Sequence, residues 1–360
     1  MPISRDRLYS IWRITLVSVN VIVVAALVAT AVWIRLENDW AKPVDRGPQD
    51  AFRHGTIGTE VMPLPVAYVL PDMFPEHFLP GGADAGDWVE QFGFLRDTDP
   101  NANQGLPIGF AITNYRPGTG APSPVEFVGF SCALCHSTRI RENGDQDGTI
   151  YYGPGSMSLN LFAWLDAFQS AVLAREPPAG EIADPAKPPP YRLTLASISK
   201  AYETKTGKKL GPFERFFIWV WLRQIRARIT EGLPRFDEPV GHGQSRDPRI
   251  TPTGPTRTQP FRTLVRTVLK RPGNDMPVYT KIATVFSEDM RKRAQFDGTI
   301  ADLYARSSLA ALAAGATITN MALPEIANNI RMASDYTSTL RRRAMTTCSR
   351  RRPRSVTQRA

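Results

Sequence analysis

Cysteine and histidine are scarce in this chain, so their positions are informative. The 360 residues include only three cysteines and four histidines. An odd cysteine count, with Cys348 in an arginine-rich C-terminal segment, argues against a disulfide framework. Two cysteines and one histidine nevertheless fall within the five residues Cys132-Ala133-Leu134-Cys135-His136. This cluster needs an explanation of its own.

The sequence also lacks a broadly distributed positive charge. The formal net charge is +10, but residues 341–360 contain eight arginines and no acidic residue. Residues 1–340 therefore carry a net charge of only +2. Such a balance does not provide the electrostatic surface of a polyanion-binding protein, and we expect no nucleic-acid partner.

No charged residue occurs between Ile14 and Ile34. As a helix, these 21 residues would rise about 31 Å, close to the thickness of a bilayer core. Arg5, Arg7 and Arg13 precede the run, which predicts a cytoplasmic segment 1–13, a transmembrane anchor 14–34 and an exported remainder. A signal peptide cleaved near residues 29–31 is the alternative; the length of the run favours the anchor.

The chain shows no run of alternating strand residues, so we expect a mainly α fold of the cytochrome c-like kind with long Pro- and Gly-rich loops. Residues 35–130 are read mostly as loop, 35–340 as the main domain and 341–360 as a disordered basic tail. The apolar phrase "FIWVWL" at 217–222 is interpreted as a buried core helix rather than a second membrane contact. Helical spacing predicts helices at 159–175, 193–206, 212–232, 263–270, 300–313 and 324–340.

The five-residue cluster has the attachment pattern of a c-type haem. In one helical turn, positions i, i+3 and i+4 share a face. Cys132 and Cys135 would then bond the two vinyl groups of one porphyrin, and His136 would be the axial iron ligand. Ser131 is a candidate N-cap of this turn. We therefore predict one covalently bound haem c.

The cluster has three alternative interpretations: a zinc site, a thioredoxin-like redox pair and a disulfide. A zinc site needs four ligands, whereas the remaining candidates, His54, His77, His242 and Cys348, form no second paired motif. A thioredoxin-like pair should open a helix after a strand in a βαβ unit, and Pro- and Gly-rich loops surround this one. A disulfide across two intervening residues would be strained. An exported location agrees best with haem attachment.

Several phrases around the haem motif resemble a family of bacterial membrane-anchored, di-haem c-type cytochromes. These phrases are "FRHGTIGTE", "VLPDMFPEHFLPGG", "LPIGF", "VGFSCALCHS", "YYGPGSMSLNLFAWLDAF", "NDMPVYTKIA" and "FDGTIADLYARSSLAALAAGA". The family is distantly similar to the rubber oxygenases and the di-haem cytochrome c peroxidases. The resemblance covers residues 50–335 and is weak over 176–255. It implies a second CxxCH motif that this sequence lacks. We hypothesise that the chain stops before a second haem domain, for example through a frameshift; the alternative is a one-haem protein with a basic tail.

The second axial ligand decides between electron transfer and catalysis, and the sequence does not single it out. The resemblance places residues 275–298 over the distal side of the haem, which favours inspection of Met276 and Phe296. Arg139 and Arg141 could pair with haem propionates, or they could lie at a solvated helix end. The complete set of ligand candidates is Met73, Met157, Met276, His54, His77 and His242.

These observations favour a c-type cytochrome anchored in the bacterial inner membrane, with its haem domain in the periplasm. It would pass electrons to or from a periplasmic or membrane redox protein. The alternative is a di-haem-type peroxidase or oxygenase, or a truncated remnant of one that only binds its cofactor. The sequence does not determine the reduction potential, the donor, the acceptor or an organic substrate.

Overall fold

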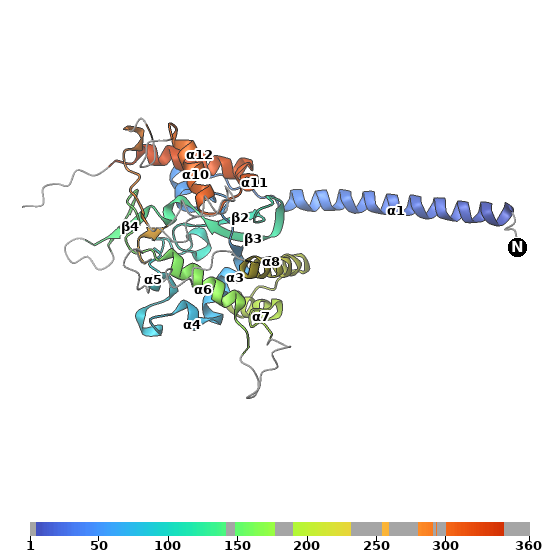
Figure 1. The fold of residues 1–360 in the computed structure, drawn as a ribbon, viewed down its shortest axis with the longest axis horizontal. Helices are drawn as coiled ribbons and strands as arrows, with labels where there is room; N and C mark the ends of the chain where they lie inside the picture. The colour runs from blue at the N-terminus through green and yellow to red at the C-terminus, as the bar shows by residue number, and fades with distance from the viewer. Residues whose placement is uncertain are drawn as a thin grey trace, which may run out of the picture.

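The computed structural model describes residues 5–141, 148–176, 190–231, 254–258, 280–290, 293 and 300–341. It is about 55% helical, which confirms the prediction of a mainly α chain. Figure 1 shows a body with α10 and α12 on one side, α3, α6 and α7 on the other, and strands β2 and β3 between them. A single long helix, α1, extends away from this body.

Five helices of the body, α6, α7, α8, α10 and α12, begin and end close to the positions that the sequence predicts, whereas α2, α3, α4, α5 and α11 were not predicted. Thr194 opens α7 with a capping box, and Gly207 ends it in the left-handed conformation at φ 71°. Asp302 caps α10 by accepting hydrogen bonds from two backbone N–H groups. The predicted helix at 263–270 lies outside the described residues. The helices are α2 (Pro48–His54), α3 (Leu64–Met73), α4 (Pro75–Phe78), α5 (Trp88–Gln91), α6 (Leu161–Leu173), α7 (Leu195–Thr206), α8 (Pro212–Glu231), α10 (Leu303–Ala313), α11 (Ile318–Met321) and α12 (Pro324–Thr339).

The prediction that residues 35–130 are mostly loop is wrong. β1 (Met62–Pro63), β2 (Phe110–Tyr115) and β3 (Pro122–Phe130) form an antiparallel sheet in the order β1-β3-β2. All but one of the six β2 residues are buried, as are the last four residues of β3. Where the strands are covered on both faces, along β2 and the last four residues of β3, apolar and polar residues do not alternate, so the period-2 signal was absent there. Two short antiparallel pairs join β4 (Ser137–Ile140) to β5 (Thr149–Tyr152), and β6 (Arg257–Thr258) to β7 (Thr280–Lys281).

The main core lies between the sheet and the helices α3, α6, α7 and α8. Trp164 of α6 makes edge-to-face contacts with three phenylalanines, Phe94, Phe110 and Phe130, at centroid distances of 5.7–5.8 Å. Two smaller buried clusters involve α2, α10 and α12. The segment that follows β3 lies between the main core and these two clusters.

Helix α1 (Arg5–Trp40) contains the one membrane-span candidate found among the described residues. Within the candidate, Thr15–Trp40, the most apolar part has a mean hydropathy of 2.4, and no residue of that part is buried against the body. Contact with the body begins near the end of the helix, where Trp40 packs on Phe217 of α8 and Glu37 lies 3.6 Å from Arg116. One N-terminal helix is therefore long and apolar enough to span a membrane.

Candidate functional site

The cluster of two cysteines and a histidine forms a single tight turn directly after β3. Cys132–Leu134 is a 3-10 turn (η3), and the backbone N–H of His136 donates to the Cys132 carbonyl at 3.2 Å. The sequence expectation of one helical turn is confirmed. Ser131 does precede the turn, but its hydroxyl does not cap it; it donates instead to the Arg53 carbonyl at 2.7 Å. Ser131 therefore occupies the predicted N-cap position, but its side chain ties the turn to α2 instead of capping it.

The phrase "LPIGF" supports this turn from behind. Gly109 has a φ of 94°, and a Cβ atom at this position would collide with the backbone of Leu134. The Gly109 carbonyl also accepts a hydrogen bond from the N–H of Ser131 at 2.8 Å. Glycine is needed at 109 because the backbone of the turn passes where a side chain would be.

The imidazole of His136 is held by a segment distant in sequence. Its Nδ1 atom lies 3.1 Å from the carbonyl oxygen of Ala283. Ala283 belongs to residues 280–290, which we call the strap. Because a carbonyl only accepts, Nδ1 must carry the proton and Nε2 is the unprotonated nitrogen of the neutral ring. Among the described residues, nothing hydrogen-bonds to Nε2.

The loop after β5 fixes the strap against the turn. Gly153 donates its N–H to the His136 carbonyl at 2.8 Å and accepts from the Val285 N–H at 2.8 Å. A Cβ at Gly153 would lie 2.6 Å from the Phe286 ring, and one at Gly155 would collide with the carbonyl oxygen of Ile282. The phrase "YYGPG" thus contains two glycines that let the strap approach His136 closely.

Burial favours the neutral forms of the two thiols and of the imidazole in this turn. Burial raises the pKa of the Cys132 thiol to about 11 and that of the Cys135 thiol to about 12. Burial, with the positive charge of Arg306, lowers the pKa of His136 to about 4 against the opposing effect of its hydrogen bond to Ala283. The histidine is therefore a neutral imidazole at physiological pH, the form in which it binds metals.

The residues fit the chemistry of a covalently attached haem. In the described part of the chain, no group of three or more His, Cys, Asp or Glu side chains gathers as a metal-ion site. A zinc site built on this motif would need such a gathering, whereas a haem needs two tethers and one imidazole nitrogen. Cys132 and Cys135 are free, partly buried thiols. The thioredoxin alternative fits poorly, since η3 lies between strands of two separate antiparallel sheets rather than in a βαβ unit, and the thiol pKa values are raised.

Four of the predicted candidates for a second axial ligand lie in the described part of the chain, and the role of each as a ligand stays a prediction. His54 is buried, with its Nε2 3.1 Å from Asp97, and His77 stacks on Phe74. Met73 packs at the edge of the main core, and Met157 is 69% exposed. No hydrogen bond or ion pair joins any of these four to His136 within the described residues. Met276, His242 and Phe296 lie outside the described residues.

The part of residues 275–298 that the structure describes contacts His136 itself, through the Ala283 carbonyl on Nδ1. The position of this segment over the distal side of a haem stays a prediction. Arg139 is in β4 and Arg141 follows it, and both are exposed. This exposure agrees with the solvated alternative for these two arginines and leaves their pairing with propionates a prediction.

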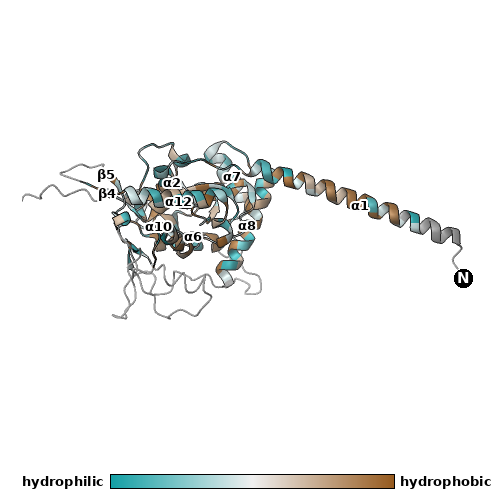
Figure 2. Cartoon of the chain, turned by 90° about the horizontal axis from the view of Figure 1, so that it is seen from above, coloured by the Kyte–Doolittle hydropathy of each residue, from teal (hydrophilic) through white to brown (hydrophobic). Residues whose placement is uncertain are grey.

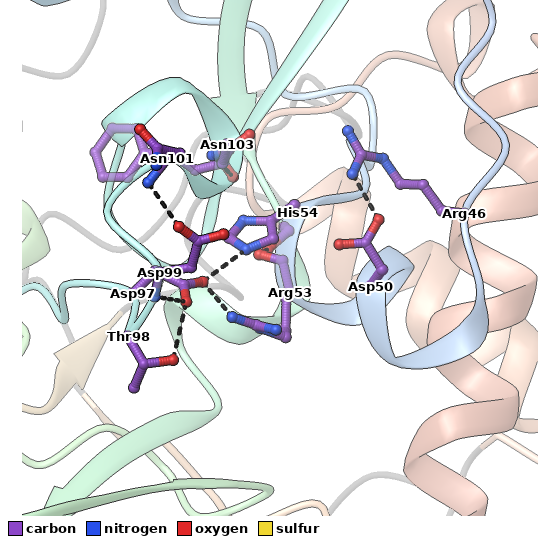
Figure 3. Close-up of polar contacts among 11 residues, drawn as sticks. Arg46, Asp50, Arg53, His54, Asp97, Thr98, Asp99, Asn101 and Asn103 are labelled. Atoms are coloured by element: carbon purple, nitrogen blue, oxygen red, sulfur yellow. Dashed lines mark hydrogen bonds and ion pairs between the residues drawn. The ribbon is translucent and has the colours of Figure 1, made fainter.

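Two buried ionic groups beside the turn were not predicted. Arg53 and His54 of α2 both contact the carboxylate of Asp97, which is only 4% exposed (Figure 3). Burial alone would raise the pKa of Asp97. The hydrogen bond from the backbone N–H of Asp99 and the positive charge of Arg53 lower it instead. Burial lowers the pKa of His54, so this histidine is neutral. The phrase "FRHG" was the available signal, because an arginine and a histidine that follow the buried Phe52 need polar partners.

The second group joins the strap to α10. Arg306 donates to Glu288 at 2.6 Å, and the two side chains are 11% and 8% exposed. The charge of Arg306 acts on both Cys132 and His136, as shown by its effect on their pKa values. No spacing in the sequence links residue 288 to 306, so sequence reasoning had no means of finding the pair.

No protein-family model, curated protein or solved structure matches the chain. The resemblance to di-haem cytochromes therefore stays a prediction, and the functional argument depends on the geometry of the turn.

Proposed function

We propose that this chain is a c-type cytochrome that carries electrons while anchored in a membrane by α1. The observation that supports the proposal best is the hydrogen bond from His136 Nδ1 to the Ala283 carbonyl. It orients a neutral imidazole and leaves Nε2 for an iron ligand, next to the two free thiols of Cys132 and Cys135. This combination suits covalent haem c better than any other use of the three residues.

Each residue of the turn has a distinct part in this proposal. Cys132 and Cys135 hold the cofactor through two thioether bonds, and His136 supplies the proximal ligand. When bound, haem supplies a centre that gains and loses one electron. Ala283 fixes the orientation and the protonated nitrogen of the ligand. The buried apolar clusters next to Cys132 and Cys135 lower the local dielectric, which tunes the potential.

Electron transfer makes fewer demands on the protein than the enzymatic alternative. A peroxidase or oxygenase needs an open coordination position together with groups that handle protons beside it. No contact in the described part of the chain assigns such groups to the far side of His136. A carrier needs only the tethers, the oriented ligand and the burial described above, so we favour it.

The charge distribution around α1 supports a periplasmic position for the body. Arg5, Arg7 and Arg13 precede the apolar run, and positive flanks stay on the cytoplasmic side. The oxidising side is also where thioether attachment takes place. The redox partner is accordingly a periplasmic or membrane protein.

The first test is covalent attachment. The full-length chain is expressed in a bacterial host that matures c-type cytochromes, and the purified protein is run on a denaturing gel stained for haem. We expect staining of the parent chain and of Cys348→Ser, a matched cysteine outside the motif. We expect none for the double variant Cys132→Ser/Cys135→Ser. A colourless parent chain would overturn the proposal.

The second test separates the carrier from the enzyme. We expect a six-coordinate, low-spin absorption and resonance Raman spectrum that does not change on addition of peroxide or carbon monoxide. A high-spin spectrum that responds to either ligand would identify the peroxidase or oxygenase alternative instead. A haem-loaded chain that no native donor reduces would identify the cofactor-binding remnant.

A further inference from the structure

Helix α8 has two faces of different character. Four residues of the "FIWVWL" phrase, Phe217, Ile218, Trp221 and Leu222, are buried in the main core, as the sequence predicted. The opposite face exposes three large aromatic side chains, which follow one another at i, i+3 and i+6. They are Phe213, Phe216 and Trp219, exposed by 46%, 52% and 43%. Such a contiguous aromatic face on a soluble surface normally marks a contact with another partner.

The position of this face indicates which partner. Phe213 packs on Trp40, the last residue of α1, with ring centroids 5.7 Å apart. Trp40 in turn contacts Trp33, which lies within the apolar run of α1. Figure 2 shows α8 on the side of the body from which α1 extends, running across the direction of α1. The exposed aromatics are therefore continuous with the end of the membrane-span candidate.

The charges on the same helix complement a lipid surface. Arg215 and Arg223 are exposed, and the guanidinium of Arg223 lies 5.0 Å from the centroid of the Trp219 ring. Aromatic rings with arginines beside them are typical of the headgroup layer, where the rings enter the acyl boundary and the guanidinium groups meet phosphate. Anionic lipids add attraction for each such arginine.

We propose that α8 lies in the headgroup layer of the bilayer that α1 enters, with Phe213, Phe216 and Trp219 inserted and Arg215 and Arg223 on lipid phosphates. The proposal rests on α1 being a membrane anchor and is independent of haem. Its consequence is that the body has one fixed orientation on the membrane. Strand β4, which follows His136 directly, lies at the end of the body away from α1 and would face the solvent (Figure 1).

The test measures lipid contact at Phe216 in the full-length chain. Phe216→Cys is made in a Cys348→Ser background, labelled with a polarity-sensitive fluorophore and reconstituted at one chain per nanodisc containing phosphatidylglycerol. Ile140→Cys is the matched control, because Ile140 is also an exposed apolar residue but belongs to β4. The Cys348→Ser chain without an added cysteine sets the labelling background, so free Cys132 or Cys135 thiols would be detected separately. Quenching is compared between brominated and ordinary lipid chains, which removes any quenching by haem.

We expect brominated chains to quench the label at 216 at least about threefold more strongly than the label at 140. Equal quenching at the two positions would overturn the proposal. Shielding of position 216 that develops only when several chains share a disc, without bromine quenching, would assign this face to a second copy of the chain and overturn it as well.

Discussion

His136 Nδ1 and the carbonyl oxygen of Ala283 lie 3.1 Å apart although 147 positions separate the two residues in the sequence. The contact depends on two glycines, because both Gly153 and Gly155 occupy places where a side chain would push the strap away. The orientation of the proposed iron ligand is therefore set by the close approach of two loops.

Gly155→Ala tests this dependence. A methyl group at 155 would collide with the Ile282 carbonyl and lie 3.2 Å from the oxygen of Ala283. The strap must move, which weakens the hydrogen bond to His136 and makes the imidazole a less basic ligand. We expect the reduction potential of the haem-loaded protein to rise, since a less basic ligand stabilises oxidised iron less.

The matched control is Gly47→Ala, because nothing lies within 4 Å of a Cβ at position 47. It should leave the potential unchanged, and both variants should stain for covalent haem. An unchanged potential in Gly155→Ala would show that the strap does not set the ligand. Equilibrium redox titration followed by visible absorption provides the measurement.

The ion pair between Arg306 and Glu288 should be a major support of the strap. Arg306→Met removes the cation from a carboxylate held in a low-dielectric site, which we expect to lower the free energy of unfolding by about 3–5 kcal/mol. The control is Arg341→Met, because the Arg341–Asp289 pair is 54% and 36% exposed and should contribute less than about 1 kcal/mol. Urea unfolding in detergent, followed by tryptophan fluorescence, measures both. Equal losses of the free energy of unfolding in Arg306→Met and Arg341→Met would contradict this expectation.

The sequence predicted those features that local patterns encode. The apolar run at 14–34 and the helix starts at Pro212 and Pro324 needed only composition, spacing and terminal residues. The turn at Cys132–His136 likewise followed from the i, i+3, i+4 geometry of its own residues.

The features that escaped prediction depend on contacts between distant segments. The sheet β1-β3-β2 was missed because its strands are buried on both faces. Serine is a common N-cap residue, but the hydroxyl of Ser131 donates to the carbonyl of Arg53, which is distant in sequence. The acceptor at Ala283 is a backbone carbonyl, which every residue type has. A single sequence therefore could not identify it as the partner of His136.

The Asp97 carboxylate should be far more important to stability than its neighbour Asp50. Asp97 contacts both Arg53 and His54 and is buried, whereas the Asp50 side chain, which pairs with Arg46, is 46% exposed (Figure 3). We expect Asp97→Asn to cost about 2–4 kcal/mol because Arg53 loses a buried counter-charge. Asp50→Asn should cost at most about 1 kcal/mol. Thermal unfolding of the two variants side by side decides the matter, and a similar shift in Tm for both would refute it.

Glu60 should make stability fall as pH rises from 4.5 to about 7. Burial raises its pKa to about 7 from 4.5, despite hydrogen bonds from Thr56 and Asn320. Between these two values the folded chain retains a proton that the unfolded chain has released, so raising the pH favours unfolding. One such proton gives a slope of up to about −1.4 kcal/mol per pH unit. Burial also raises the pKa of Glu325, which adds a contribution of the same sign.

Glu60→Gln should remove the part of this slope that belongs to Glu60 and retain the part that belongs to Glu325. The control is Glu203→Gln, because Glu203 is exposed and pairs only with Lys209 at 3.4 Å among the described residues. Urea unfolding at pH 5, 6, 7 and 8 gives the free energy for each variant. If the slope of Glu60→Gln equals that of the parent chain, the carboxylate at 60 does not hold its proton in the folded state, and the hydrogen bonds from Thr56 and Asn320 outweigh its burial.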